Sequence, residues 1–189
     1  MSVSLLDLWM PILLGGILAW LASAVVHTVL KYHNSDYQKL TNEDEVGAVI
    51  AKGGAAPGFY SFPHCVDMKE MQDEGMQKRF EQGPVGMLAV MPNGMPPMGK
   101  LIGQQVVYSI AACVLIAYCA SMALAPGADY LTVFRFVAAV GFLTFGWAVL
   151  PFSIWYGHPW STSAKYLFDA AIYGLLVGGA FGWLWPAAA

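Results

Sequence analysis

Apolar residues dominate four long stretches of the chain, and polar residues gather in the segments between them. A helix needs about 20 predominantly apolar residues to cross the hydrocarbon core of a bilayer. Each of the four stretches reaches that length, and prolines mark the ends of the last three. The pattern predicts an all-α membrane protein, a four-transmembrane-helix bundle with spans in residues 1–31, 100–125, 128–151 and 164–186.

The segment 32–99, between the first and second spans, is too long to be a simple connector. Acidic first turns and i,i+4 charge pairs predict short helices at about 42–52 and 67–80. A short apolar run followed by a Pro-Asn-Gly turn predicts a strand and turn at about 85–95. The aromatic-rich segment Pro57–Pro63 is expected to be irregular. We therefore expect an insertion domain of two helices and a small hairpin-like element.

Composition agrees with this class of protein. Hydrophobic residues make up 58% of the 189 positions and charged residues only 11%, whereas soluble domains carry about 25% charged residues. The net charge of −3 gives no reason to expect nucleic-acid binding. The expected partners are therefore the lipid bilayer and other membrane subunits or further copies of this chain.

Positive charges near the span ends predict the orientation. Cytoplasmic loops are enriched in Lys and Arg. The basic residues that flank the predicted spans all lie on the side of the large loop, at Lys31, Lys39, Lys100 and Lys165. We therefore expect the insertion to be cytoplasmic and both termini to lie outside. The stretch Met1–Leu8 has no basic residue, so the first span is interpreted as a retained helix and not as a signal peptide.

Small residues recur every four positions on two of the predicted spans. Small side chains let helix backbones approach closely, which favours helix association in lipid. This spacing predicts either packing within the bundle or contact with a partner subunit. The residues are Gly174, Gly178 and Gly182 on the fourth span, and Gly15, Ala19 and Ser23 on the first.

Four polar side chains lie within the predicted spans close to the cytoplasmic face. They are His27 in the first span, Gln104 and Gln105 in the second, and Asp169 in the fourth. At these depths they are expected to meet in one polar cluster. A His–Asp pair there can relay a proton or hold a cation. The alternative is that the four groups only satisfy one another's hydrogen bonds.

Arg135 lies about 8 Å from the outer end of the third span at 1.5 Å per residue. At that depth a long side chain can extend to the interface. The alternatives are contact with another subunit and a site for an anion or lipid headgroup. Asp129, six residues away, is an imperfect partner, and Asp169 is expected near the opposite face.

Weak metal-ligand candidates lie in the insertion. Seven of the ten methionines lie between Met68 and Met98, and Met68 and Met71 follow His64 and Cys65. Thioether and thiolate groups suit Cu(I), but the spacing is irregular, and methionine also fills gaps between apolar groups. No metal site is assigned from the sequence. No cofactor is predicted, and a bound lipid or pigment is left open.

The chain resembles uncharacterised four-span bacterial membrane proteins of unknown function. The likeness rests on the segments Gly83–Gly86, Met98–Lys100 and Ser153–Thr162, and it is greatest from Trp155 to Trp183. It covers the layout of most of the chain. The resemblance implies a bacterial inner-membrane location and supplies no catalytic residues.

No nucleophile elbow, P-loop, zinc-protease motif or C-x-x-C pair is present in the sequence. The sequence therefore predicts no catalytic residues and favours a protein that is not an enzyme. The expected function is a non-catalytic accessory or scaffold subunit of a larger bacterial membrane complex. The alternative is a small oligomeric transporter or channel for a proton, metal ion or small solute, acting through His27, Gln104, Gln105 and Asp169.

Overall fold

A computed structural model describes residues 3–188, so residues 1 and 2 of the predicted first segment, 1–31, lie outside the described part. Four helices in the described part are long and apolar enough to cross a membrane. They are Leu5–Leu30, Met98–Ala123, Tyr130–Trp155 and Trp160–Trp183. The predicted class, an all-α membrane protein with four spans, is therefore confirmed, and the chain is a multi-pass membrane protein.

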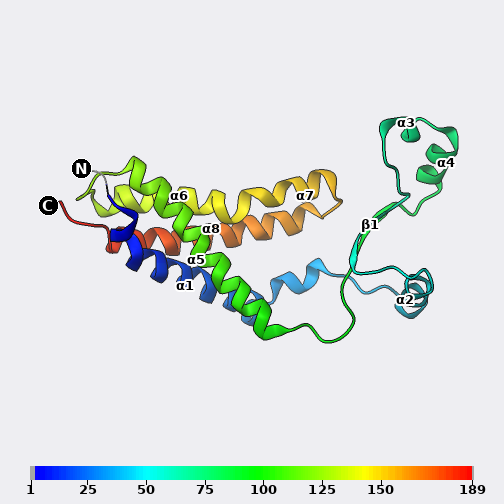
Figure 1. The fold of residues 1–189 in the computed structure, drawn as a ribbon, viewed down its shortest axis with the longest axis horizontal. Coiled ribbons are helices and arrows are strands. Elements are labelled where there is room, and N and C mark those ends of the chain that lie inside the picture. Colours follow the sequence, from blue (N-terminus) through cyan, green and yellow to red (C-terminus); the bar gives the residue numbers. More distant parts are fainter. Residues whose placement is uncertain (1–2, 189) are drawn as a thin grey trace. The chain divides into compact units, whose positions relative to one another are not determined.

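Two of the four spans are composite helices. The first consists of η1 (Leu5–Leu8), α1 (Trp9–Val25) and the π-helical turn η2 (Val26–Leu30). The third consists of α6 (Tyr130–Gly146), η4 (Trp147–Val149) and α7 (Leu150–Trp155). The second and fourth spans are the single helices α5 (Met98–Ala123) and α8 (Trp160–Trp183). The start of η1 and the end of α8 lie at the same end of the bundle (Figure 1).

The third span continues beyond Pro151, where the sequence predicts that it ends. The 3₁₀ turn η4 interrupts the helix just before this residue. Pro151 then occupies the first turn of α7, where proline is tolerated because its missing N–H would have no partner inside the helix. The span therefore extends to Trp155.

Glycines on α8 bring this helix against α6. A Cβ atom added at Gly174 would lie 2.7 Å from the carbonyl oxygen of Ala138, and one at Gly178 would lie 2.9 Å from that of Phe134. At Gly182 the added atom would lie 2.8 Å from the Tyr130 ring. Larger residues would push the two backbones apart. The structure therefore uses the glycine line of the fourth span for packing inside the bundle.

The small residues of α1 also face inward. A Cβ atom at Gly15 would lie 3.3 Å from Val177 of α8, and Ala19 is buried. Ser23, one turn later, lines a cavity between the helices that is described below. The two small-residue lines therefore lie inside the bundle, where α1, α5, α6 and α8 share one apolar core.

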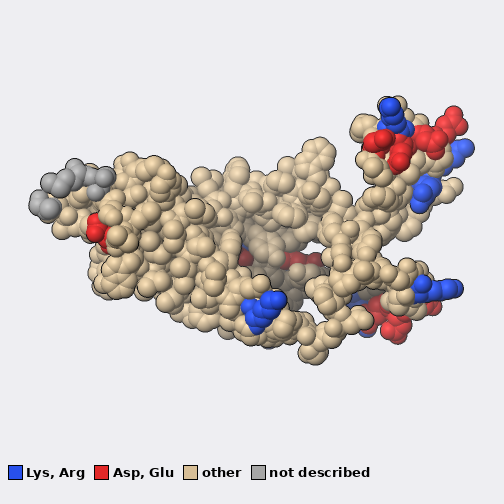
Figure 2. Space-filling view, viewed as in Figure 1, with Lys and Arg blue, Asp and Glu red and all other residues tan. Residues whose placement is uncertain are grey.

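The outer surface of the bundle is apolar. Large hydrophobic side chains such as Leu115, Leu143 and Trp183 are more than half exposed. In Figure 2 the visible face of the bundle carries almost no Lys, Arg, Asp or Glu. A surface of this kind suits lipid and not water, as expected for a membrane-spanning bundle.

Residues 38–96 form a separate compact unit. The unit contains α2 (Glu43–Lys52), β1 (Gly58–Phe62), α3 (Met68–Met71), α4 (Glu74–Gln82) and β2 (Gly86–Val90). The strands pair antiparallel, with Tyr60 opposite Leu88. The segment that contains β1 is therefore a strand and not irregular, because its aromatic residues favour extended backbone. The one helix expected at 67–80 is divided in two, and Asp73 caps the second helix.

This insertion unit has almost no core of its own. Pro63 is the single buried residue among positions 38–96. Large apolar side chains remain exposed, including Phe59 at 67%, Val66 at 75% and Met95 at 93%. A unit of this size that buries so little apolar surface has little to stabilise it in isolation.

Candidate functional site

The end of the first span has an unusual backbone. His27 lies on the π-helical turn η2, and such turns recur at functional sites. The turn ends at Lys31, the one non-glycine residue with positive φ (53°) among residues 3–188. This left-handed residue stops the helix. The short 3₁₀ helix η3 (Tyr32–Asp36) follows at once and packs against α8.

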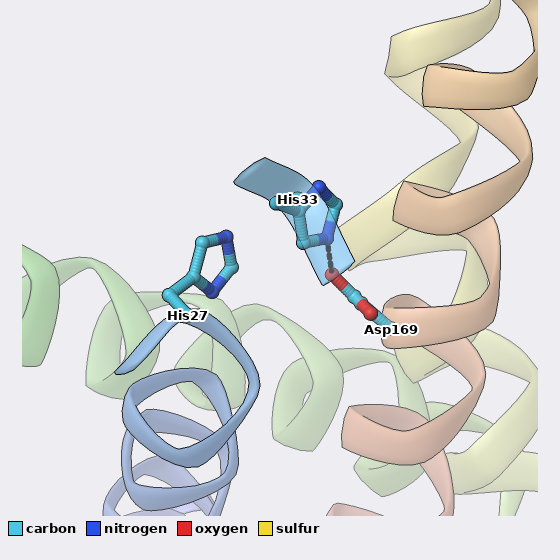
Figure 3. Close-up of side chains that lie close together, drawn as sticks. All are labelled: His27, His33 and Asp169. Atoms are coloured by element: carbon cyan, nitrogen blue, oxygen red, sulfur yellow. Dashed lines mark hydrogen bonds and ion pairs between the residues drawn. The ribbon is translucent and has the colours of Figure 1, made fainter. Parts of the chain in front are cut away.

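His33 of η3 is held between two carboxylates. Its Nδ1 lies 2.7 Å from Oδ2 of Asp36, and its Nε2 lies 2.8 Å from Oδ2 of Asp169 on α8 (Figure 3). The side chains of all three residues are at most 7% exposed. A neutral imidazole has one N–H and so donates to only one carboxylate. The arrangement therefore calls for one additional positive charge, a proton or another cation, between the ring and a carboxylate.

Lys165 completes the ionic part of the cluster. Its Nζ donates to Oδ1 of Asp36 at 2.6 Å, to Ser35 Oγ at 2.7 Å and to the Tyr32 carbonyl at 2.9 Å. Burial alone would raise the pKa of Asp36, but hydrogen bonds from Lys165 and His33 outweigh burial and lower this pKa below its ordinary value. Two carboxylates and one ammonium leave one negative charge, which a single added positive charge neutralises.

Tyr32 holds the other oxygen of Asp169. Its hydroxyl donates to Oδ1 of that carboxylate. Burial, together with the hydrogen bond to Asp169 and its negative charge, raises the pKa of the Tyr32 phenol well above its ordinary value, so this group remains a donor. Both oxygens of Asp169 therefore have partners from η3, and the carboxylate is fixed in one orientation.

His27 faces the same cluster from η2. Its ring stacks on His33 with centroids 4.7 Å apart and planes within 1° of parallel. Its Nδ1 lies 2.9 Å from the carbonyl oxygen of Ser23. Because a carbonyl only accepts hydrogen bonds, Nδ1 carries the proton, and Nε2 of the neutral ring keeps its lone pair. One ligand atom from each of His27, His33 and Asp169 lies within 4.8 Å of the other two, so these residues can hold a metal ion.

A partly open cavity of about 370 Å³ between the helices reaches two of these residues, His27 and Asp169. Ser23, Gln105 and Ser109 contribute polar groups to its wall, and aromatic rings from three of the spans complete the wall. The Tyr173 hydroxyl, which also lines the cavity, is buried and has no hydrogen-bond partner among residues 3–188. The cavity therefore offers polar groups to an occupant inside the membrane-spanning part.

The structure assembles most of the predicted polar cluster but not all of it. His27, Gln105 and Asp169 line one cavity, whereas Gln104 does not line it. On a helix adjacent residues point in different directions, so only one of the two glutamines can face inward. Sequence reasoning missed Tyr32 and His33, which hold Asp169. It also missed Asp36 and Lys165, which support His33 from behind as an ion pair.

His33 and Asp36 follow the predicted end of the first span at residue 31, and their side chains are buried because η3 folds back onto α8. One signal was available in the sequence. A histidine with an acid three residues later directly follows the span, and a single helical turn places such a pair side by side. Lys165 is a second signal, since it lies four residues before Asp169.

Arg135 does not join this site. Its side chain is exposed on α6, and it makes no hydrogen bond or ion pair with any residue between positions 3 and 188. Asp129 instead caps α6, accepting from the backbone N–H groups of Leu131 and Thr132. The exposed position is compatible with a side chain that extends to the interface, and no partner for Arg135 is found in the described structure.

The candidate ligands of the insertion unit are not gathered into a metal centre. His64 contacts Ser61, and Cys65 contacts the Asp67 carbonyl. Neither belongs to a set of three His, Cys, Asp or Glu ligand atoms in the described part of the chain. Met68 and Met71 lie on the single-turn helix α3 and are exposed.

No protein-family model, curated protein or solved structure matches this chain.

Proposed function

We propose that this protein is a small membrane transporter or channel for a cation, and that His27, His33 and Asp169 form its cation-binding site. The observation that carries the proposal is the buried His33, held between two carboxylates beside a polar cavity in a four-span bundle. Charged groups inside membranes are costly, and they commonly mark ion pathways and proton relays. The net charge of this cluster is balanced by one additional positive charge.

The net negative charge of the cluster favours a cation over an anion as the bound ion. The cluster contains Asp36 and Asp169 against the single ammonium of Lys165. The His27 and Asp169 side chains line the cavity, so an ion can exchange through it. Four spans are few for a lone transporter, and we therefore expect the working unit to be an oligomer of this chain.

Flux measurements test the proposal. The purified protein is reconstituted into vesicles, and uptake of protons and of divalent metal ions is followed with trapped fluorescent indicators. We expect uptake above that of protein-free vesicles for one of these ions, and its loss in Asp169→Asn. Asp129→Asn is the matched control, because Asp129 lies outside the cluster and caps α6. Equal uptake with and without wild-type protein would refute the proposal.

A second candidate is the role of an accessory or scaffold subunit in a larger membrane complex. The specific observation in its favour is the insertion unit, with one buried residue among positions 38–96 and many exposed apolar side chains. A partner protein would cover such a surface. Native membranes are extracted in mild detergent, and the tagged chain is isolated for mass spectrometry. Stoichiometric partners would support this role, and recovery of this chain alone would contradict it.

The proposed location is a bacterial inner membrane, with both termini outside and the insertion in the cytoplasm. The positive-inside rule supports this orientation, because Lys31, Lys100 and Lys165 all lie at the insertion side of the bundle. Reporter fusions to the C-terminus test it. Activity of a periplasmic reporter and silence of a cytoplasmic one are expected, and the reverse result would overturn the orientation.

A further inference from the structure

We infer that the cation of the proposed site is a divalent transition-metal ion, with Zn²⁺ as the representative, bound by Nε2 of His27, Nε2 of His33 and a carboxylate oxygen of Asp169. This inference rests on the proposed cation site and names its ligand class. The three residues come from η2, η3 and α8, so metal binding would join the first and last spans (Figure 3).

The first argument is that both histidines already have the partners that metal-bound histidines use. Histidine ligands usually donate the second ring N–H to a carbonyl or a carboxylate, which fixes the tautomer and the ring orientation. His27 Nδ1 has the Ser23 carbonyl at 2.9 Å, and His33 Nδ1 has the Asp36 carboxylate at 2.7 Å. In both rings this leaves Nε2 as the metal-binding atom.

The carboxylate ligand is supported in the same way. Tyr32 donates to Oδ1 of Asp169 and leaves Oδ2 directed at His33. Lys165 in turn holds Asp36, the acceptor behind His33. The ligands on η3 and α8 are therefore oriented by a second layer of hydrogen bonds, which is the arrangement that tunes metal affinity in proteins.

The distances need only small adjustments on one side of the site. Two ligand atoms at about 2.1 Å from Zn²⁺ with tetrahedral geometry are about 3.4 Å apart. His33 Nε2 and Asp169 Oδ2, at 2.8 Å, would separate by a few tenths of an ångström. The His27 side is looser, because the three ligand atoms span up to 4.8 Å and the two imidazole planes are parallel. The His27 ring must therefore tilt toward His33 while it keeps its hydrogen bond to the Ser23 carbonyl, and the exposure of the side chain leaves space for this tilt.

The donor set selects the class of ion. Two imidazole nitrogens and one carboxylate oxygen suit Zn²⁺, Fe²⁺ and neighbouring metals. Ca²⁺ and Mg²⁺ bind through oxygen ligands and retain little affinity for imidazole. Three protein ligands leave a fourth position for water or another ligand, and the cavity of about 370 Å³ beside His27 and Asp169 provides the space.

Zn²⁺ binding to the full-length protein in detergent micelles tests the inference. Equilibrium dialysis at neutral pH, with the metal measured by mass spectrometry, is expected to give one ion per chain. His27→Ala removes a ligand and should weaken binding by more than about 100-fold, because loss of an outer-layer partner alone costs about 10–100-fold. Asp36→Asn, which changes such a partner, should fall in that 10–100-fold range.

His158→Ala is the matched control, because this histidine lies in the loop before α8 and outside the cluster. It should bind Zn²⁺ like the wild type. His27 is exposed, so His27→Ala is expected to fold, and an unchanged thermal transition verifies this. Less than about one tenth of an ion per wild-type chain would overturn the inference, and so would wild-type affinity in folded His27→Ala.

The flux experiment separates this inference from the proposed function. Proton uptake that depends on Asp169, without Zn²⁺ binding by the purified protein, would retain the cation transporter and refute the metal. Zn²⁺ binding that depends on His27, without uptake of any cation, would retain the metal site and refute the transporter.

Discussion

Asp129 and Asp169 lie near opposite ends of the four-helix bundle, and the two aspartates have opposite environments. Asp129 is exposed and accepts hydrogen bonds from Leu131 and Thr132, two and three residues further along the chain. Asp169 is 1% exposed, and its partners Tyr32 and His33 lie 137 and 136 residues away. One aspartate completes a helix locally. The other joins two distant parts of the chain.

The difference in environment distinguishes a carboxylate that caps a helix from one that is a candidate for a functional role. An N-cap has a defined local task, the satisfaction of free backbone N–H groups, and needs nothing further. A buried carboxylate must be compensated by groups from elsewhere, and a buried ionic network is weak evidence for stability because desolvation offsets much of its attraction. A costly network beside a cavity is therefore better explained by a task such as binding a cation.

The largest loss of stability is expected when Asp169, the buried aspartate, is replaced. Asp169→Ala leaves His33 and Lys165 with one carboxylate between them and removes the acceptor of Tyr32. A buried donor left without its acceptor should cost about 1–3 kcal/mol. Loss of the acceptor of both Tyr32 and His33 should therefore cost about 2–6 kcal/mol of unfolding free energy. Thermal unfolding in detergent measures the loss. Asp129→Ala is the comparison, and an equal loss in the two variants would remove the distinction between the two ends.

Lys165→Met should have the next largest effect, because it leaves Asp36 without its ammonium partner in a buried position. The expected loss is about 3 kcal/mol. The double variant Lys165→Met/Asp36→Asn removes the uncompensated charge and should recover part of that loss. Additive losses in the double variant would show that the two side chains are not coupled, contrary to their 2.6 Å contact.

Two glycines, Gly146 near Asp169 and Gly182 near Asp129, allow the effect of overpacking on stability to be distinguished from its effect on Zn²⁺ binding. A Cβ atom at Gly146 would lie 2.5 Å from Ala170 Cβ, next to Asp169, and one at Gly182 would lie 2.8 Å from the Tyr130 ring, next to Asp129. Each glycine-to-alanine change should cost about 1–3 kcal/mol through overpacking. Only Gly146→Ala should weaken Zn²⁺ binding. Equal binding in both variants would mean that the cluster tolerates displacement of α8.

The smallest change in stability is expected from the titration of the exposed Asp129 carboxyl. Hydrogen bonds from Thr132 lower the pKa of this carboxyl below its ordinary value. A lowered pKa contributes stability above the pKa of the unfolded chain, and this contribution is lost as the pH falls through the folded value. Asp129→Asn should therefore shift the melting temperature by only a few degrees at neutral pH and flatten its decline below about pH 4. An unchanged acid profile would contradict this contribution.

The sequence predicts the local features of the molecule and misses the distant ones. Four apolar stretches identify the spans because length and hydropathy alone decide whether a helix can cross a bilayer. His27, Gln105 and Asp169 were expected to lie together because their depths in the membrane match. The fold-back of η3 was not predicted. It depends on the left-handed residue Lys31 and on contacts with α8, 136 residues later for the His33–Asp169 pair, and a sequence pattern records neither.

The separation of His33 from Asp169 has a consequence for biosynthesis. Ribosomes add about 5–20 residues per second, so roughly 7–27 s pass between the synthesis of His33 and that of Asp169, which lies 136 positions later. During that interval the first span is in place, while the acid and the lysine supplied by α8 do not yet exist. The cluster can form only when the fourth span has been inserted. A chain truncated before α8 would keep three spans but would have no cation site.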